Sequence, residues 1–168
     1  MTASKHFKVN EFLCPCCGRG EVEISQGLVA MLEKLREKMN STAIIITSGY
    51  RCSQHDREVG GSGTGMHTKG GACDIVVHKE NGLPYDSFTV AECAESIGFT
   101  GIGIIDNTAC HVDIRGTIPY VNSKWFGNER TNEIYTTFKG MGRIEIVSRE
   151  TQFACPHCGK NIIVKKGV

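Results

Sequence analysis

Two histidines and an aspartate in the middle of the chain are residue types that bind a catalytic zinc ion. His67 and Asp74 are separated by six residues in the segment HTKGGACD. The histidine lies in an expected loop and the aspartate in an expected strand. His111 lies in another expected strand, and neighbouring strands are about 4.8 Å apart. Two imidazoles and one carboxylate leave a fourth coordination position for a water, whose pKa bound zinc lowers to about 7. The sequence therefore predicts a catalytic zinc site at these three residues.

The cysteines suggest a second zinc ion with a structural role. The chain has nine cysteines and repeats the form CxxCG, as CPCCG at residues 14–18 and as CPHCG at residues 155–159. Each such turn presents two thiolates to a metal, and four thiolates close a structural site. A shared ion would also join the two ends of the chain and lower the entropy of the unfolded state. The predicted ligands are Cys14, Cys17, Cys155 and Cys158.

Other readings of these cysteines stay open. The CxxCG pairs could form separate disulfides or be unrelated free thiols. Cys16 and His157 lie beside the predicted ligands and are expected not to bind the metal. The remaining four cysteines are scattered singly, and free cysteine is often a small buried side chain. We expect that role for Cys52, Cys73, Cys93 and Cys110.

The elements that must position these residues follow from hydrophobic patterning. Apolar residues at helical spacing predict a helix over residues 26–39, and a second helix is expected over residues 87–97. Short β-branched or apolar runs predict strands. The Gly-rich stretch 48–71 is expected to be a loop that arranges side chains around a site. The expected strands are 43–47, 72–77, 100–105, 110–114, 144–147 and 161–164, with an irregular stretch from 115 to 130.

This order of elements predicts an α+β fold with a mostly antiparallel sheet, because helices and strands do not alternate strictly. We expect a domain over residues 1–140 and a zinc-ribbon-like extension over residues 141–168. The formal net charge of +1 argues against a general nucleic-acid binder. No stretch reaches the roughly 20 apolar residues of a membrane span, and the polar N-terminal residues predict a cytoplasmic protein. The sequence does not indicate an oligomeric state.

Four motifs in a fixed order give the chain a family resemblance. SGYRC at 48–52, VGG at 59–61, HxxGxAxD at 67–74 and HVDIR at 111–115 resemble the zinc D-Ala-D-Ala carboxypeptidase family. WFGNERT at 125–131 is similar to the tail of its small phage and bacterial peptidase and endolysin branch. The resemblance covers about residues 7–127 and implies a Hedgehog-type fold. It also implies zinc-dependent hydrolysis of an amide bond in peptidoglycan stem peptides, by a D-Ala-D-Ala carboxypeptidase or an endolysin-type endopeptidase.

The resemblance also implies roles for particular residues. His67, Asp74 and His111 match the zinc ligands, and Arg51 matches a substrate-binding arginine. The planar fork of arginine suits a peptide carboxylate and a developing oxyanion. Gly65 replaces a serine that family members often have, and Thr64 is the candidate substitute.

The general base is a further departure from the family pattern. Thr108 stands where several members have an acid, so the base is expected to be Asp113 or Asp106. We favour Asp113, which shares a strand face with His111. Asp113 could instead orient His111 from behind.

Two other functions stay open on these departures. A chain without a competent base would be a non-catalytic zinc-binding module of the same fold. A nucleic-acid-binding zinc-ribbon protein is a third possibility, which the charge does not favour. Turnover of peptidoglycan that chelation abolishes would favour the peptidase, and salt-sensitive retention on DNA would favour the third.

Overall fold

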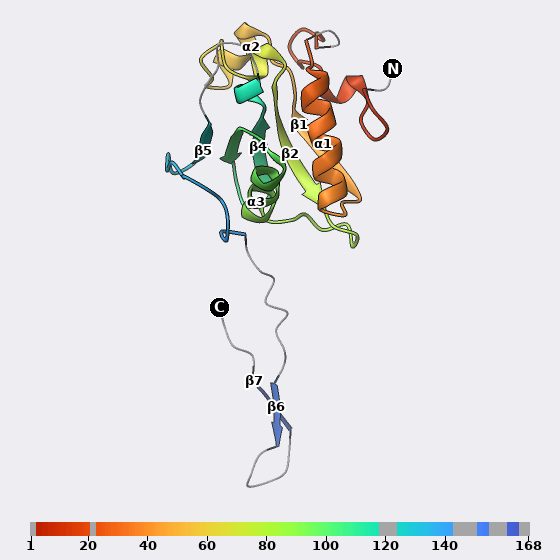
Figure 1. Ribbon diagram of the computed structural model, residues 1–168, viewed down its shortest axis with the longest axis vertical. Coiled ribbons are helices and arrows are strands. Elements are labelled where there is room, and N and C mark those ends of the chain that lie inside the picture. The colour runs from red at the N-terminus through yellow and green to blue at the C-terminus, as the bar shows by residue number, and fades with distance from the viewer. Residues whose placement is uncertain (1–2, 21–22, 118–123, 143–150, 155–160, 165–168) are drawn as a thin grey trace.

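The computed structural model of the chain describes residues 3–20, 23–117, 124–142, 151–154 and 161–164. A sheet in the order β1-β2-β4-β3-β5 forms its centre (Figure 1). All neighbouring pairs in this sheet are antiparallel except β3 and β5, which are parallel. The strands of this sheet are β1 (Ala43–Ser48), β2 (Ala72–His78), β3 (Gly101–Ile104), β4 (Ala109–Asp113) and β5 (Trp125–Asn128).

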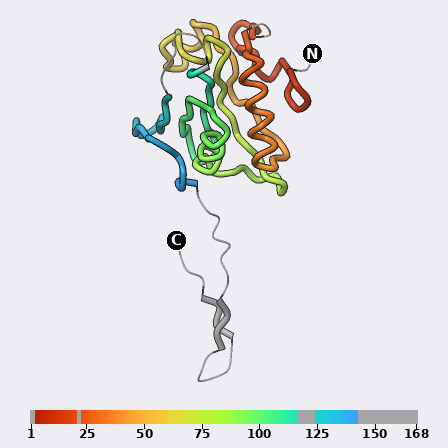
Figure 2. Tube along the Cα trace, in the orientation of Figure 1, coloured from red at the N-terminus to blue at the C-terminus, as the bar shows by residue number. Residues whose placement is uncertain are grey.

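Three α-helices accompany the sheet: α1 (Gln26–Lys38), α2 (Ser53–Glu58) and α3 (Ser87–Ile97). The helices α1 and α3 contact each other, and α3 also packs on β3 and β4. Both lie over the same side of the sheet, whereas α2 lies near one end of it (Figures 1 and 2). Short 3₁₀ helices occur at Val9–Phe12, His67–Lys69 and Arg115–Thr117.

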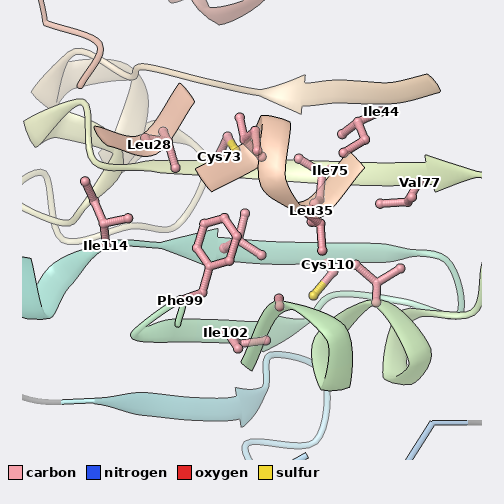
Figure 3. Close-up of a cluster of buried hydrophobic side chains, with 14 of the residues drawn as sticks. Leu28, Leu35, Ile44, Cys73, Ile75, Val77, Phe99, Ile102, Cys110 and Ile114 are labelled. Carbon is pink, nitrogen blue, oxygen red and sulfur yellow. The ribbon is translucent and has the colours of Figure 1, made fainter. Parts of the chain in front are cut away.

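Strand alternation divides the central strands between a core face and a second face. Cys73, Ile75 and Val77 of β2 are fully buried in the core that the helices cover (Figure 3). Cys110 and Val112 of β4 join the same core. Because successive side chains of a strand point to opposite faces, the residues between these positions face away from the helices. The apolar residues of β2 and β4 thereby determine where the side chains between them point.

The fold class confirms the prediction from sequence: the chain is α+β with a mostly antiparallel sheet. The stretch 48–71 is not only a loop, because it contains α2 and a 3₁₀ helix. The sequence SQHDRE of α2 is almost entirely polar and carries no apolar periodicity that would have revealed a helix. The stretch 115–130 is not wholly irregular either, since β5 pairs with β3 there. Both elements depend on tertiary contacts more than on local pattern.

The last part of the chain contains a separate two-stranded antiparallel sheet of β6 (Thr151–Ala154) and β7 (Asn161–Val164). Its second strand agrees with the expected 161–164. The expected strand at 144–147 lies outside the described residues. The domain boundary between residues 140 and 141 and the zinc-ribbon-like character of the extension stay predictions. None of the helices that the structure describes is long and apolar enough to cross a membrane.

Candidate metal centre

The three predicted zinc ligands meet on the face of the sheet opposite the helices. Asp74 of β2 and His111 of β4 are direct register partners, and His67 approaches them from its 3₁₀ helix. Asp74 Oδ1 lies 3.0 Å from His111 Nδ1 and 3.2 Å from His67 Nε2, and these two nitrogens are 3.2 Å apart. Ligand atoms around a tetrahedral zinc at about 2.0 Å are about 3.3 Å from one another. The three side chains therefore have the spacing of one coordination sphere.

The backbone carbonyl of Gly49 orients His67. The Nδ1 atom of His67 lies 2.7 Å from the Gly49 oxygen, which can only accept, so Nδ1 carries the proton. Its Nε2 atom is then left with a lone pair directed at the other two ligands. Such a hydrogen bond on the far nitrogen is how proteins set the tautomer of a metal-binding histidine.

Asp113 orients His111 in the same way. Its Oδ2 atom lies 3.2 Å from His111 Nε2, and the guanidinium of Arg115 binds the same carboxylate. Burial disfavours a charged imidazole, but hydrogen bonds to Asp113 and Asp74 outweigh it and raise the pKa of His111 to about 10. Asp113 itself is fully buried. The carboxylate thus stands behind the ligand, where it favours a cationic ring or a ring bound to a cation.

Asp74 is held ionised by its neighbours. Burial alone would raise the pKa of Asp74, but hydrogen bonds with His111 and His67 keep it well below the ordinary value. Its second oxygen, Oδ2, accepts a hydrogen bond from Nη2 of Arg51. Arg51 also donates from Nε to Ser48 and lies 3.6 Å from Asp56. A carboxylate locked in this way offers one oxygen, Oδ1, to a metal.

The donor set fits zinc on its own chemistry. Two ring nitrogens and one carboxylate oxygen converge on one point, and each residue is anchored on its other polar atom. This is a three-ligand set of the kind that keeps one position open. The residues also have to lose or share protons for the metal to bind, so metal and proton compete for His111.

A cavity of about 320 Å³ opens over this cluster. It is lined by all three ligands and by Arg51, Arg115, Trp125 and Glu129. The ring centroids of Trp125 and His111 are 6.2 Å apart in an edge-to-face arrangement, and the Arg115 guanidinium lies over the Trp125 ring. Two arginines and an aromatic ring therefore line the cavity beside the three candidate ligands.

Glu129 was not among the residues selected from the sequence. A Cβ atom on Gly103 would lie 3.0 Å from Glu129 Oε1, so the carboxylate lies over Gly103. Gly103 is the register partner of His111, which puts Glu129 beside the metal ligands. Glu129 belongs to the stretch WFGNERT, which the sequence linked only to the family resemblance. The parallel pairing of β5 with β3 brings this glutamate to the cavity.

Two other predicted site residues lie differently. Asp106 accepts hydrogen bonds from the backbone of Thr108 and Ala109 in the β3–β4 turn and lines a separate cavity of about 280 Å³. Thr64 is exposed and bonds to Ser62, and the cavity is lined by its neighbours Ser62 and Gly65. Neither side chain is brought to the metal ligands.

A second group of possible metal ligands lies elsewhere among the described residues. The thiols of Cys14, Cys17 and Cys52 are all within 4.8 Å of one another. Cys52 was expected to be only a small buried side chain, and no spacing rule connects it to Cys14. Cys155 and Cys158, the other two predicted ligands, lie outside the described residues.

Comparison with known proteins agrees with the geometry of the histidine and aspartate cluster. A family model described as Peptidase M15 matches residues 5–113, which is most of the chain and includes His67, Asp74 and His111. Among proteins with curated descriptions, none matches. M15 is a zinc D-Ala-D-Ala carboxypeptidase-type family, and its peptidases depend on zinc. The matched range contains His67, Asp74 and His111, which could hold a metal ion, and the chain therefore belongs to the peptidase M15 family.

Proposed function

We propose that this chain hydrolyses an amide bond in the stem peptides of peptidoglycan, using zinc held by His67, Asp74 and His111. The observation that carries the proposal is the cluster itself, in which three ligand atoms lie 3.0–3.2 Å apart under a cavity with two arginines. A zinc ion in this site supplies a Lewis acid and a water of lowered pKa. Stem peptides carry free carboxylates, which the basic side chains of the cavity suit.

Glu129 is the proton carrier in this proposal. The acidic residues that line the cavity are Asp56, Asp74 and Glu129. Asp74 is a ligand, and Asp56 is buried where it contacts Arg51 and the backbone of Gly63. Glu129 accepts a proton from the attacking water as the O–C bond forms. It then delivers the proton to the amine nitrogen as the C–N bond breaks.

Asp113 orients His111 in this proposal and is not the general base. The sequence had favoured Asp113 as the base and had given the orienting role as the alternative. Its carboxylate is fully enclosed and is occupied by His111 and Arg115. A carboxylate in this place fixes the ring that binds the metal and increases its basicity. Asp113 is therefore a positioning residue, and its neighbour Arg115 holds it in place.

Arg51 has two functions in the proposal. It pairs with Oδ2 of Asp74, which would leave Oδ1 as the oxygen that holds a metal. It also lines the cavity, where part of the guanidinium meets the substrate carboxylate or the oxyanion of the scissile carbonyl. Because both Arg51 and Arg115 line one cavity, substrates with more than one carboxylate are favoured.

Defined muropeptides test the proposal directly. Purified full-length chain loaded with zinc is incubated with a pentapeptide stem, a cross-linked dimer and a tetrapeptide stem, and the products are weighed by mass spectrometry. Release of D-alanine indicates a carboxypeptidase, cleavage of the dimer a cross-link endopeptidase, and loss of the L-alanine end an L-Ala-D-Glu endopeptidase. A phage endolysin would act on the intact cell wall of the host bacterium. Intact peptidoglycan sacculi therefore serve as a fourth substrate.

The same experiment separates the enzyme from its main alternative. Cleavage that a chelator abolishes and added zinc restores supports the peptidase. One equivalent of zinc bound by the histidine and aspartate cluster without turnover of any substrate would instead support a non-catalytic zinc-binding module. Glu129 lines the cavity and is a candidate general base, which supports the enzyme over the non-catalytic module.

A further inference from the structure

The cysteine-rich turn near the start of the chain forms a metal site with a residue far along the sequence. We propose that Cys14, Cys17 and Cys52 bind a structural zinc ion within the folded domain itself. Cys52 is 38 residues from Cys14, yet its amide lies 3.4 Å from the Cys14 sulfur. This group shares no ligand with the histidine and aspartate cluster.

Geometry supports a shared ion at these thiols. All three sulfurs are within 4.8 Å of one another, and all three cysteines are free. Sulfurs bound to one tetrahedral zinc at about 2.3 Å are about 3.8 Å apart, so a small closure brings them onto one ion. Three thiolates with a fourth ligand close the coordination sphere, which is typical of structural zinc.

Hydrogen-bond donors lie beside the sulfurs of the cluster. The Cys52 amide donates to the Cys14 sulfur, and the His55 amide donates to the Cys52 sulfur at 3.4 Å. The Arg19 side chain hydrogen-bonds Cys17 and brings a positive charge to the cluster. Amide donors around metal-bound sulfur fix the ligands and spread their negative charge.

The turn at residues 14–19 brings the Cys17 thiol close to the Cys14 thiol. The Cys14 amide donates to the Arg19 carbonyl, and the Gly18 amide donates to the Cys14 carbonyl. Gly18 has a φ of +67°, a conformation that most other residues adopt only at a cost. Cys16, an exposed free cysteine of the same turn, is a candidate for the fourth ligand among the residues that the structure describes.

A metal here would support the peptidase site at a distance. Phe12, two residues before Cys14, accepts a hydrogen bond at its carbonyl from the Tyr50 amide and so joins this part of the chain to the segment Gly49–Cys52. Contact at Gly49 is so close that a Cβ atom there would lie 2.5 Å from the Phe12 Cα. The same short segment orients His67 through the Gly49 carbonyl and holds Asp74 through Arg51. Ligation of Cys52 therefore anchors the segment that positions two of the three catalytic ligands.

Zinc counting in the full chain tests the proposal. The double variant His67→Ala, His111→Ala removes the histidine and aspartate site, so we expect about one zinc per chain to remain. Adding Cys52→Ser or Cys17→Ser should reduce this to nearly zero. Cys17 is exposed, so its replacement leaves no cavity, and circular dichroism checks that the fold persists. Cys93→Ser, which alters a half-buried cysteine outside the cluster, should keep the zinc.

Cobalt gives a readout that does not depend on activity. Cobalt bound by thiolates shows a sulfur-to-metal charge-transfer band, which the variant lacking both histidines should keep and Cys52→Ser should lose. The double variant Cys155→Ser, Cys158→Ser should retain the band and the zinc. Retention of zinc in folded Cys52→Ser protein would overturn the proposal. Loss of zinc in the Cys155, Cys158 double variant would also overturn it, in favour of a site shared between the two CxxCG turns.

Discussion

The two candidate metal sites are built on different kinds of backbone. Asp74 and His111 are register partners in adjacent strands, so the hydrogen bonds of the sheet determine their separation. Cys14 and Cys17 instead lie in a turn that its own two backbone hydrogen bonds close. A sheet keeps its geometry whether or not a metal is present, whereas a turn of this kind gains much of its order from the ion.

The two sites also differ in the residues that surround their ligands. Each ligand of the histidine and aspartate cluster has a partner behind it: Gly49 for His67, Asp113 for His111, and Arg51 for Asp74. The cysteine cluster instead has backbone amide donors to two of its sulfurs and one arginine beside Cys17. These surroundings suit one site to keep a coordination position open and the other to close its coordination sphere. Variants at both sites test this difference.

Removing a ligand from the sheet-borne site should have the largest effect. We expect His67→Ala to reduce hydrolysis of muropeptides to background and to lower the zinc content by one equivalent. Its melting temperature should change little, because the sheet register does not depend on the metal. His78→Ala, a histidine at the end of the same β2 strand that carries Asp74, is the matched control and should retain activity. Unfolding of His67→Ala would contradict the view that the sheet presets this site.

Replacing the cavity acid should have the next largest effect. Glu129→Gln should lower kcat by about 10²–10⁴-fold with unchanged zinc content, because proton transfer contributes about that much. Glu133→Gln, an exposed glutamate four residues further on that bonds to Thr131 and Tyr135, is the control. Steady-state kinetics with metal analysis makes the measurement. Full activity in Glu129→Gln would remove Glu129 from the mechanism.

Weakening the support behind His111 should have a smaller effect. Asp113→Asn should lower zinc affinity by about 10–100-fold, because the amide no longer supports the ring as a carboxylate does. Competition with a chelating dye measures this, and kcat at saturating zinc should recover most of its value. If kcat stayed low at saturating zinc, Asp113 would be the general base. Asp106→Asn, at the β3–β4 turn, should change neither quantity.

The smallest effect concerns the segment that precedes the cysteine turn. Ser4 and His6 hydrogen-bond Glu33 of α1 and lower the pKa of this carboxyl to about 2, although burial acts in the opposite direction. A folded pKa below the unfolded value of about 4.5 stabilises the fold above that pH, and the stabilisation is lost as pH falls towards 2. Because the pair is partly exposed, Glu33→Gln should cost roughly 1 kcal/mol or less at neutral pH.

Thermal unfolding at several pH values checks this last prediction. A cost of 1 kcal/mol corresponds to a melting temperature lower by about 2–4 °C for a chain of this size. The difference between variant and wild type should shrink as the pH falls towards 2, the pKa of Glu33 in the folded protein, and should vanish below it, where both carry a neutral side chain. Glu37→Gln on the same helix is the control. A difference that persisted at pH 2 would show that packing, and not the charge of Glu33, anchors the segment.

Much of the sheet-borne site follows from sequence. The apolar residues of β2 and β4 alternate with Asp74 and His111, and this alternation already places both ligands on one face. The order of the motifs indicated the family, and the match of the family model over residues 5–113 confirms it. The helices at 26–39 and 87–97 agree with α1 and α3 to within a residue, because their apolar periodicity is strong. These features are local, or repeat at the period of one element, and so can be read along the chain.

The tertiary structure alone decided which distant residues meet. Cys52 joins Cys14 and Cys17 because a loop packs against the segment after β1, and no period along the chain records that contact. Glu129 reaches the cavity through parallel pairing of β5 with β3, which a four-residue strand with little alternation does not predict. The pairing of the strands places Asp113 behind His111 and Glu129 on the cavity. The ligand types and the strand faces on which they lie can be read from the sequence, whereas the packing of the strands and loops selects the residues that each ligand contacts.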